Sequence, residues 1–191
     1  MTNKEKVVAL LKSIETGAAE PIGYINPNKY TQHNLGAADG LEGFGELMKM
    51  LPANTAKANT VRAFQDGDFV VAHTEYDFFG PKIGFDIFRF EKGFIVEHWD
   101  NTQELNKDEK LEIAKITDLN KTKENKQLIQ KMIDKKVLEG KYFKNHKILA
   151  QGNFVLALNE LEKNNQKISL YELFDIKDSK TNVTLEVNND Q

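Results

Sequence analysis

The sequence contains no cysteine, only four prolines and a single tryptophan. Without cysteine the chain can form no disulfide bond, no thiolate metal site and no thiol nucleophile. It also has no run of about 18 apolar residues, which a membrane-spanning helix needs, and no apolar segment behind a basic start that would predict a secretory signal. We therefore expect a cytoplasmic protein.

The chain also lacks an excess of positive charge. Its 191 residues include 26 Lys and Arg against 29 Asp and Glu, for a net charge of -3. A chain of this balance presents no broad basic surface, so we expect no nucleic acid and no membrane among its partners. With 40% hydrophobic residues, it can bury the core of one domain, or of one domain and part of another.

Two amphipathic helices are predicted near the N-terminus. The first occupies residues 2–16, where Thr2 and Glu5 form a capping-box pattern, apolar residues follow at helical spacing and Gly17 ends the helix. The second occupies residues 39–51. The segment between them is rich in turn-forming and polar residues, so we expect a long connection there with one short ordered piece.

After residue 60 the apolar residues recur with a period of two, which predicts β-strands. Four β-rich runs follow one another up to residue 103. They are separated by residues that favour tight turns: Asp66-Gly67, Gly80-Pro81 and Glu91-Lys92-Gly93. The sequence therefore predicts a four-stranded antiparallel meander and, with the helices, a fold of the α+β class.

The last hairpin decides whether three ionisable residues share a face. A three-residue loop at residues 91–93 sets Asp86 opposite His98 and Gly84 opposite Asp100. Since alternate residues of a strand project from the same face, Asp86, His98 and Asp100 then lie together.

The preceding hairpin adds two further groups to that face. A two-residue loop at residues 80–81 sets Glu75 opposite Asp86 and His73 opposite Phe88. A slip of one residue in either loop would separate these groups.

A cluster of carboxylates and imidazoles in an apolar setting is typical of proton-transfer sites, because burial and charged neighbours shift their pKa values towards neutrality. Two simpler interpretations stay open. His98 and Asp100 can be a structural hydrogen-bonded pair, and His73 can be a core histidine bonded to Glu75. Imidazoles and carboxylates also suit zinc or iron, but the sequence contains no HxH or HExxH spacing, so we predict no metal site.

Four segments, in this order and spacing, resemble the SnoaL-like family of polyketide cyclases, which belongs to the nuclear transport factor 2-like superfamily. They are YTQHN (30–34), DGDFVVAHTEY (66–76), GFDIFRFEKG (84–93) and IVEHWDNTQ (95–103). The resemblance spans residues 1–105. It implies a cone-shaped curved antiparallel sheet, packed by the N-terminal helices, that encloses one small-molecule pocket.

The resemblance also implies roles for individual residues. The characterised cyclases close rings by intramolecular aldol condensation without a cofactor, and the aspartate of their HWD-like segment, which matches Asp100, is the proposed acid/base. His98 and Asp86 would tune this aspartate, and Asp86 stands where those cyclases have a histidine. The expected substrate-binding residues are His33, Tyr30, His73, Glu75 and Phe88.

We therefore expect acid/base chemistry on a carbonyl compound, of the cyclase or isomerase type and with no cofactor. The alternative is a non-catalytic protein of the same fold that binds a small ligand or serves as a scaffold.

The second half of the chain repeats part of the first. AQGNFVLALNE (150–160) parallels QDGDFVVAHTE (65–75), and Leu158 stands where His73 does. We therefore predict that residues 123–178 are a truncated, degenerate second repeat with lost polar groups and a structural role. A coincidental helix and hairpin is the alternative.

The remaining residues complete this predicted organisation. Residues 106–122 form a charged connector and residues 179–191 a C-terminal tail. We expect either an intramolecular pseudo-dimer, in which the second repeat covers the outer face of the first sheet, or a homodimer.

Overall fold

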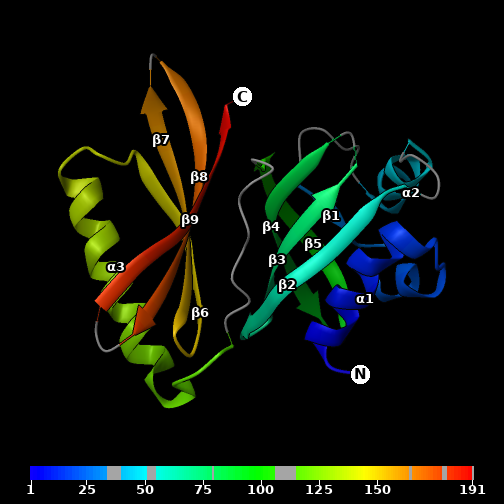
Figure 1. Ribbon diagram of the computed structural model, residues 1–191, viewed down its shortest axis with the longest axis horizontal. Helices are drawn as coiled ribbons and strands as arrows, with labels where there is room; N and C mark the ends of the chain where they lie inside the picture. The colour runs from blue at the N-terminus through cyan, green and yellow to red at the C-terminus, as the bar shows by residue number, and fades with distance from the viewer. Residues whose placement is uncertain are drawn as a thin grey trace. The chain divides into compact units, whose positions relative to one another are not determined.

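The computed structural model describes residues 1–33, 40–50, 55–78, 80–105, 115–163, 165–177 and 180–190 (Figure 1). The chain divides into two compact units, Met1–Ile113 and Ala114–Gln191, and each contains its own helix-covered sheet. No helix among the described residues is long and apolar enough to cross a membrane.

The N-terminal unit begins with helix α1 (Asn3–Thr16), as predicted. The Thr2 side chain accepts a hydrogen bond from the Glu5 amide, and the Glu5 carboxylate accepts one from the Thr2 amide, so the capping box is formed. A short 3-10 helix, η1 (Glu20–Tyr24), follows it. Helix α2 (Gly40–Met50) confirms the second predicted helix.

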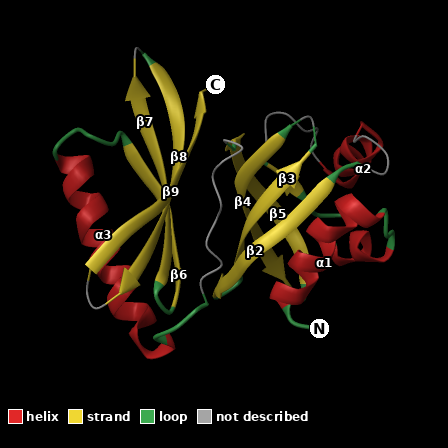
Figure 2. Ribbon diagram, viewed as in Figure 1, coloured by secondary structure: helices red, strands yellow, loops and turns green. Residues whose placement is uncertain are grey.

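Five strands form the sheet of this unit, in the order β1-β5-β4-β3-β2 (Figure 2). They are β1 (Thr31–Gln32), β2 (Lys57–Asp66), β3 (Phe69–Asp77), β4 (Pro81–Glu91) and β5 (Phe94–Glu104). Strand β1 runs parallel to β5, and the other four form the predicted antiparallel meander. The α+β class is therefore confirmed.

Helix α1 packs against one face of this sheet, which we call the helix-facing side. The buried cluster between them contains Val7, Leu10, Leu11, Ile25, Tyr30, Ala58, Val70, Ala72, Tyr76, Phe88, Phe90 and Ile95. Side chains at alternate positions of β3, β4 and β5 reach this cluster, and their neighbours in sequence project from the opposite face.

The loop between β3 and β4 differs from the prediction. Asp86 pairs with Ala72, whereas the predicted two-residue loop paired it with Glu75. The register of β3 against β4 is therefore three residues from the predicted one. Because this shift is an odd number, it moves the side chains of β3 to the other face relative to β4.

The loop between β4 and β5 is one residue shorter than predicted. It consists of Lys92 and Gly93, which have φ values of 50° and 81°, the positive values that a two-residue type I′ hairpin requires. A β-bulge at Val96 adds a second shift of one residue. Together the two shifts move the register by two residues, an even number. Asp86, His98 and Asp100 therefore share the predicted face, although the predicted cross-strand partners are wrong.

The C-terminal unit contains η2 (Leu119–Lys121), α3 (Thr122–Leu138) and an antiparallel sheet in the order β6-β7-β8-β9. The strands are β6 (Lys144–Gln151), β7 (Phe154–Lys163), β8 (Gln166–Lys177) and β9 (Lys180–Asp190). Helix α3 packs on one face of the sheet through Ile129 and Ile133. Strand β9 occupies the segment predicted as a tail, where apolar residues alternate with polar ones.

The two sheets share two features of their strand pairing. The first strand of each meander, β2 and β6, contains a β-bulge at an equivalent point. Asp86 lies opposite Ala72 in the first sheet, and Glu172 lies opposite Ala157 in the second. The prediction that the second half has lost its polar groups is wrong, because Glu172 is fully buried in its sheet.

Candidate functional site

Three ionisable side chains converge on the helix-facing side of the N-terminal sheet. Asp86 in β4 and Asp100 in β5 are cross-strand partners, and His98 lies two residues before Asp100 on the same face. One oxygen or nitrogen atom from each of the three lies within 4.8 Å of the others. The distance between His98 Nε2 and Asp86 Oδ1 is 3.2 Å. The structure thus brings together the three residues that the sequence indicates as a candidate site.

Two aromatic residues position this cluster. The imidazole of His98 stacks on the ring of Phe88, with centroids 4.3 Å apart and an angle of 7° between the planes. The Tyr76 hydroxyl donates a hydrogen bond of 2.6 Å to Asp86 Oδ2. Burial, together with the negative charge of Asp86, raises the pKa of Tyr76 well above its usual value, so the phenol keeps its proton and stays a donor.

Strand β1 brings Gln32 beside His98. The two residues are partners in the parallel ladder, and Gln32 Nε2 lies 3.0 Å from His98 Nδ1. The same amide nitrogen lies 3.4 Å from the hydroxyl oxygen of Tyr30, which is buried in the helix-facing cluster. A continuous chain of polar contacts therefore runs from Tyr30 through Gln32, His98 and Asp86 to Tyr76.

The charge on His98 depends on two opposed effects. Burial lowers the pKa of His98, but the hydrogen bond with Asp86 and the negative charges of Asp100 and Asp86 outweigh burial, so the pKa lies above its ordinary value. The imidazolium form is therefore available at a higher pH than in a free histidine.

His73 and Glu75 lie on the opposite face of the sheet, contrary to the prediction. The ring of His73 stacks on Phe85, and its Nδ1 lies 3.1 Å from Arg62 Nη1. Burial, and secondarily the positive charge of Arg62, lowers the pKa of His73 to about 3. Glu75 accepts a hydrogen bond of 2.8 Å from Asn59. The prediction placed both residues on the wrong face because the observed register of β3 against β4 differs from the predicted one by an odd number of residues.

His33 is a second correction. Gln32 faces the cluster, so the next residue projects from the opposite side of the sheet. There the His33 ring stacks on Trp99, with centroids 4.5 Å apart and an angle of 3° between the planes, and its Nε2 lies 3.9 Å from Glu97 Oε1. His33 therefore does not line the helix-facing side.

Of the five predicted binding residues, Tyr30 and Phe88 do lie on the helix-facing side. Sequence reasoning missed Gln32 and Tyr76. Both belong to segments that resemble the cyclase family, and Tyr76 alternates with the buried residues of its strand, but nothing in the sequence shows that either contacts the cluster.

The same three side chains are the candidate ligands for a metal ion. A neutral imidazole nitrogen and two carboxylate oxygens are donors that zinc, iron or manganese accepts. Their existing contacts are also those of a metal-free acid/base group, because His98 and Tyr76 both bond Asp86 directly.

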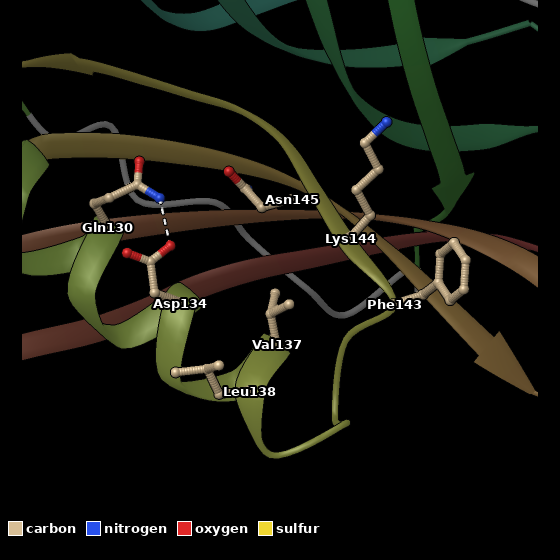
Figure 3. Close-up of a pocket in the computed structure, with 7 residues that line it drawn as sticks. All are labelled: Gln130, Asp134, Val137, Leu138, Phe143, Lys144 and Asn145. Carbon is tan, nitrogen blue, oxygen red and sulfur yellow. Dashed lines mark hydrogen bonds between the residues drawn. The ribbon is translucent and has the colours of Figure 1, made fainter.

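A surface groove lies in the C-terminal unit, between α3 and β6 (Figure 3). It has a volume of about 460 Å³ and is lined by Gln130, Asp134, Val137, Leu138, Phe143, Lys144 and Asn145. The amide of Gln130 donates to Asp134 across one side of the groove at 2.8 Å. None of the site residues predicted from the sequence lines it.

No protein-family model and no curated protein matches the chain. Several solved structures do. TsrD from Streptomyces laurentii is 18% identical, covers 53% of this chain and 91% of its own, and has a TM-score of 0.43. IdmH, a candidate polyketide cyclase from Streptomyces antibioticus, is 18% identical, with coverage of 51% and 89% and a TM-score of 0.42. An NTF2-like protein of unknown function from Cytophaga hutchinsonii is 16% identical, with coverage of 54% and 91% and a TM-score of 0.46. The structural neighbours of this chain thus include NTF2-like proteins and candidate polyketide cyclases.

Proposed function

We propose that the N-terminal unit holds a small-molecule site for acid/base chemistry next to a carbonyl group, without a cofactor. The expected reaction is an aldol condensation, as in a cyclase, or an isomerisation. The observation that supports this proposal is the convergence of Asp86, His98 and Asp100 within 4.8 Å on the helix-facing side of the sheet. Two carboxylates around one imidazole can accept, hold and return a proton.

Asp100 is the better candidate for the general base. Both oxygens of Asp86 already accept hydrogen bonds, one from Tyr76 and one from His98, and Asp86 is only 4% exposed. Asp100 is more exposed than Asp86, so a substrate can reach it more easily. In this proposal Asp100 takes the proton from the carbon beside the carbonyl and later returns it to the product.

His98 is the candidate for charge stabilisation. As an imidazolium it would lower the energy of an enolate oxygen that develops beside the cluster. Its ring is held on Phe88 and tied to Asp86, so its position is defined before a substrate arrives. Apolar residues of the helix-facing cluster lie on this side of the sheet, and an apolar setting strengthens this electrostatic effect.

The test is exchange of the proton beside a carbonyl. A panel of small ketones and aldehydes is incubated in deuterated water with the protein, and loss of the proton signal is followed by NMR. We expect the wild type to accelerate exchange for at least one compound and Asp100→Asn to reduce the rate by about 10² to 10⁴-fold, the usual contribution of a general base.

Asp77→Asn is the matched control, because Asp77 is an exposed aspartate at the end of β3. It should exchange protons at the wild-type rate. Equal rates for wild type and Asp100→Asn would remove Asp100 from the mechanism.

A non-catalytic ligand-binding or scaffold role is the second candidate. It is favoured by the packing of Tyr76, Phe88 and Phe90 into one hydrophobic cluster with α1, because such packing fills space that a substrate would need. Under this alternative, no compound exchanges its proton faster with wild-type protein than without it.

A further inference from the structure

Asp86, His98 and Asp100 also meet the requirements of a metal site. Each side chain offers one nitrogen or oxygen atom, and these three atoms lie within 4.8 Å of one another. Within the part of the chain that the structure describes, no other three His, Asp or Glu side chains form such a group. The three ligands come from two neighbouring strands. The HxH and HExxH spacings place ligands in one segment of sequence, so their absence does not bear on this set.

The spacing of the first two ligand atoms suits zinc. Zinc binds nitrogen and oxygen atoms at about 2.0–2.2 Å in tetrahedral geometry, so two of its ligands lie roughly 3.4 Å apart. His98 Nε2 and Asp86 Oδ1 lie 3.2 Å apart, and both side chains are buried. These two atoms can therefore bind one ion with little movement. The Asp100 carboxylate needs a shift on the order of 1 Å to join them.

The outer contacts of the cluster are also those of a metal site, in which a further hydrogen bond orients each ligand. The Tyr76 hydroxyl donates to Asp86 Oδ2, which leaves Oδ1 to face His98. With zinc on Nε2, the proton of His98 lies on Nδ1, and the Gln32 amide, whose nitrogen is 3.0 Å away, can turn its oxygen towards it. Phe88 stacks on the imidazole and fixes its plane. Two of the three ligands are thus held in place before an ion arrives.

The chemistry of the three donors selects among metal ions. Magnesium and calcium prefer sites made of oxygen atoms, whereas an imidazole with two carboxylates suits zinc. Two carboxylates also balance the charge of a divalent ion, which a buried site requires. Three protein ligands leave a fourth position on zinc. Asp100 is more exposed than the other two ligands, so an ion can enter from its side.

We propose that Asp86, His98 and Asp100 form a site for one zinc ion. This inference goes beyond the proposed function and does not depend on it. Zinc would occupy the lone pairs through which Asp100 accepts a proton, so the zinc-bound state and the reacting state exclude each other. Zinc is then an inhibitor of the proposed reaction and not its cofactor.

Isothermal titration calorimetry of the chelator-treated protein with zinc chloride tests the site. We expect one tightly bound zinc ion per chain. His98→Gln and Asp100→Asn should each weaken binding by at least about 100-fold, because removal of an outer partner alone costs roughly 10- to 100-fold. Magnesium chloride at about 100-fold excess should not displace the zinc, because magnesium takes oxygen ligands and gives up its water reluctantly.

His146→Gln is the matched control. His146 Nε2 lies 2.9 Å from Glu160 Oε2, and this pair with its exposed histidine is a second place where zinc can bind. If the proposal is correct, the variant holds its zinc ion with wild-type affinity. Weaker binding in His146→Gln would assign the zinc to that pair and overturn the proposal.

Circular dichroism establishes that each variant is folded. Asp100 is the partly exposed ligand, so Asp100→Asn tests the site even where His98→Gln unfolds. No zinc binding by the wild type, or equal affinities of the wild type and Asp100→Asn, would overturn the proposal, and displacement by magnesium would overturn the assignment to zinc. The titration needs no substrate and the proton-exchange assay needs no metal, so each can fail without the other.

Discussion

Two buried histidines of the N-terminal unit behave in opposite ways because their neighbours differ in charge. His98 lies between the carboxylates of Asp86 and Asp100, which favour its cationic form. His73 lies beside the guanidinium of Arg62, which opposes the cationic form, and burial opposes it further. The two rings are on opposite faces of one sheet, so the same strands create an environment for a charged imidazole and one for a neutral imidazole.

His73 should make the protein sensitive to acid. Its pKa is about 3 in the folded state and near 6.5 in the unfolded state, so between these values only the unfolded chain takes up the proton. Stability then falls by about 1.4 kcal/mol per pH unit as the pH drops. From pH 7 to pH 5, His73→Gln should lose roughly 2 kcal/mol less unfolding free energy than the wild type does.

Urea unfolding at the two pH values measures this difference. The raised pKa of His98 adds stability as the pH falls from 7 through the unfolded-state value, but it does so in both proteins and therefore cancels from the difference between them. His146→Gln, at an exposed histidine, is the control. If the wild type and His73→Gln lose the same unfolding free energy between pH 7 and pH 5, His73 is not the source of the acid sensitivity.

At the scale of elements, the turns decide what the strands present. The loop between β3 and β4 and the loop between β4 and β5 each differ from the prediction. The register of β3 against β4 differs from the predicted one by an odd number of residues, so His73 and Glu75 lie on the face opposite to the predicted one. In the hairpin of β4 and β5, the bulge in β5 adds a second shift of one residue, so the predicted face is kept. The sequence contains turn-forming residues at both places, but the hydrogen bonds that close a loop depend on the whole ladder.

One turn of the C-terminal unit gives a prediction about close packing. Gly152, between β6 and β7, has a φ of 62°, and a Cβ added there would lie 2.0 Å from the Thr117 carbonyl oxygen. That oxygen also accepts a hydrogen bond from Asn153. Gly152→Ala should therefore lower the unfolding free energy by about 3 kcal/mol, from backbone strain and overpacking together.

Gly140→Ala provides the comparison for this substitution. Gly140 has a φ of 69°, but nothing lies within 4 Å of an added Cβ, so only the strain of about 1 kcal/mol should appear. Chemical denaturation of both variants separates the two effects. Equal losses would mean that the chain near Thr117 moves away at no cost.

At the scale of the whole molecule, each unit contains a buried carboxylate that is bonded to a phenol and to a basic nitrogen. In the first unit Tyr76 and His98 contact Asp86. In the second, Tyr142 Oη donates to Glu172 Oε2 at 2.7 Å and Lys136 Nζ donates to Oε1 at 3.0 Å. The lysine contributes a full charge where the first unit has an imidazole. The two arrangements share a phenol that donates to the buried carboxylate, and they differ in the basic partner, which forms an ion pair in the second unit.

This ion pair should be essential to the second unit. Glu172 is fully buried, so Lys136→Met leaves a buried carboxylate without its counter-charge and should lower the unfolding free energy by about 3 kcal/mol. Lys135→Met is the control, because that side chain is 76% exposed. Denaturant unfolding checks both, and the double variant Lys136→Met/Glu172→Gln should recover part of the loss.

The second repeat, its boundaries, the pseudo-dimer and the homodimer stay predictions. A helix and four strands suffice to bury one face of a sheet, and α3 with β6 to β9 contains these parts. Strand β1, which brings Gln32 to His98 in the first unit, has no counterpart among the described strands of the second sheet.

The sequence by itself determined the helices, the meander and the side of the sheet on which Asp86, His98 and Asp100 meet. These follow from local periodicity and capping, which act over a few residues. The tertiary structure alone decided that His33, His73 and Glu75 lie on the other face and that Gln32 and Tyr76 complete the cluster. Those outcomes depend on strand register and on a parallel pairing between residues 66 positions apart, and no local pattern encodes such long-range contacts.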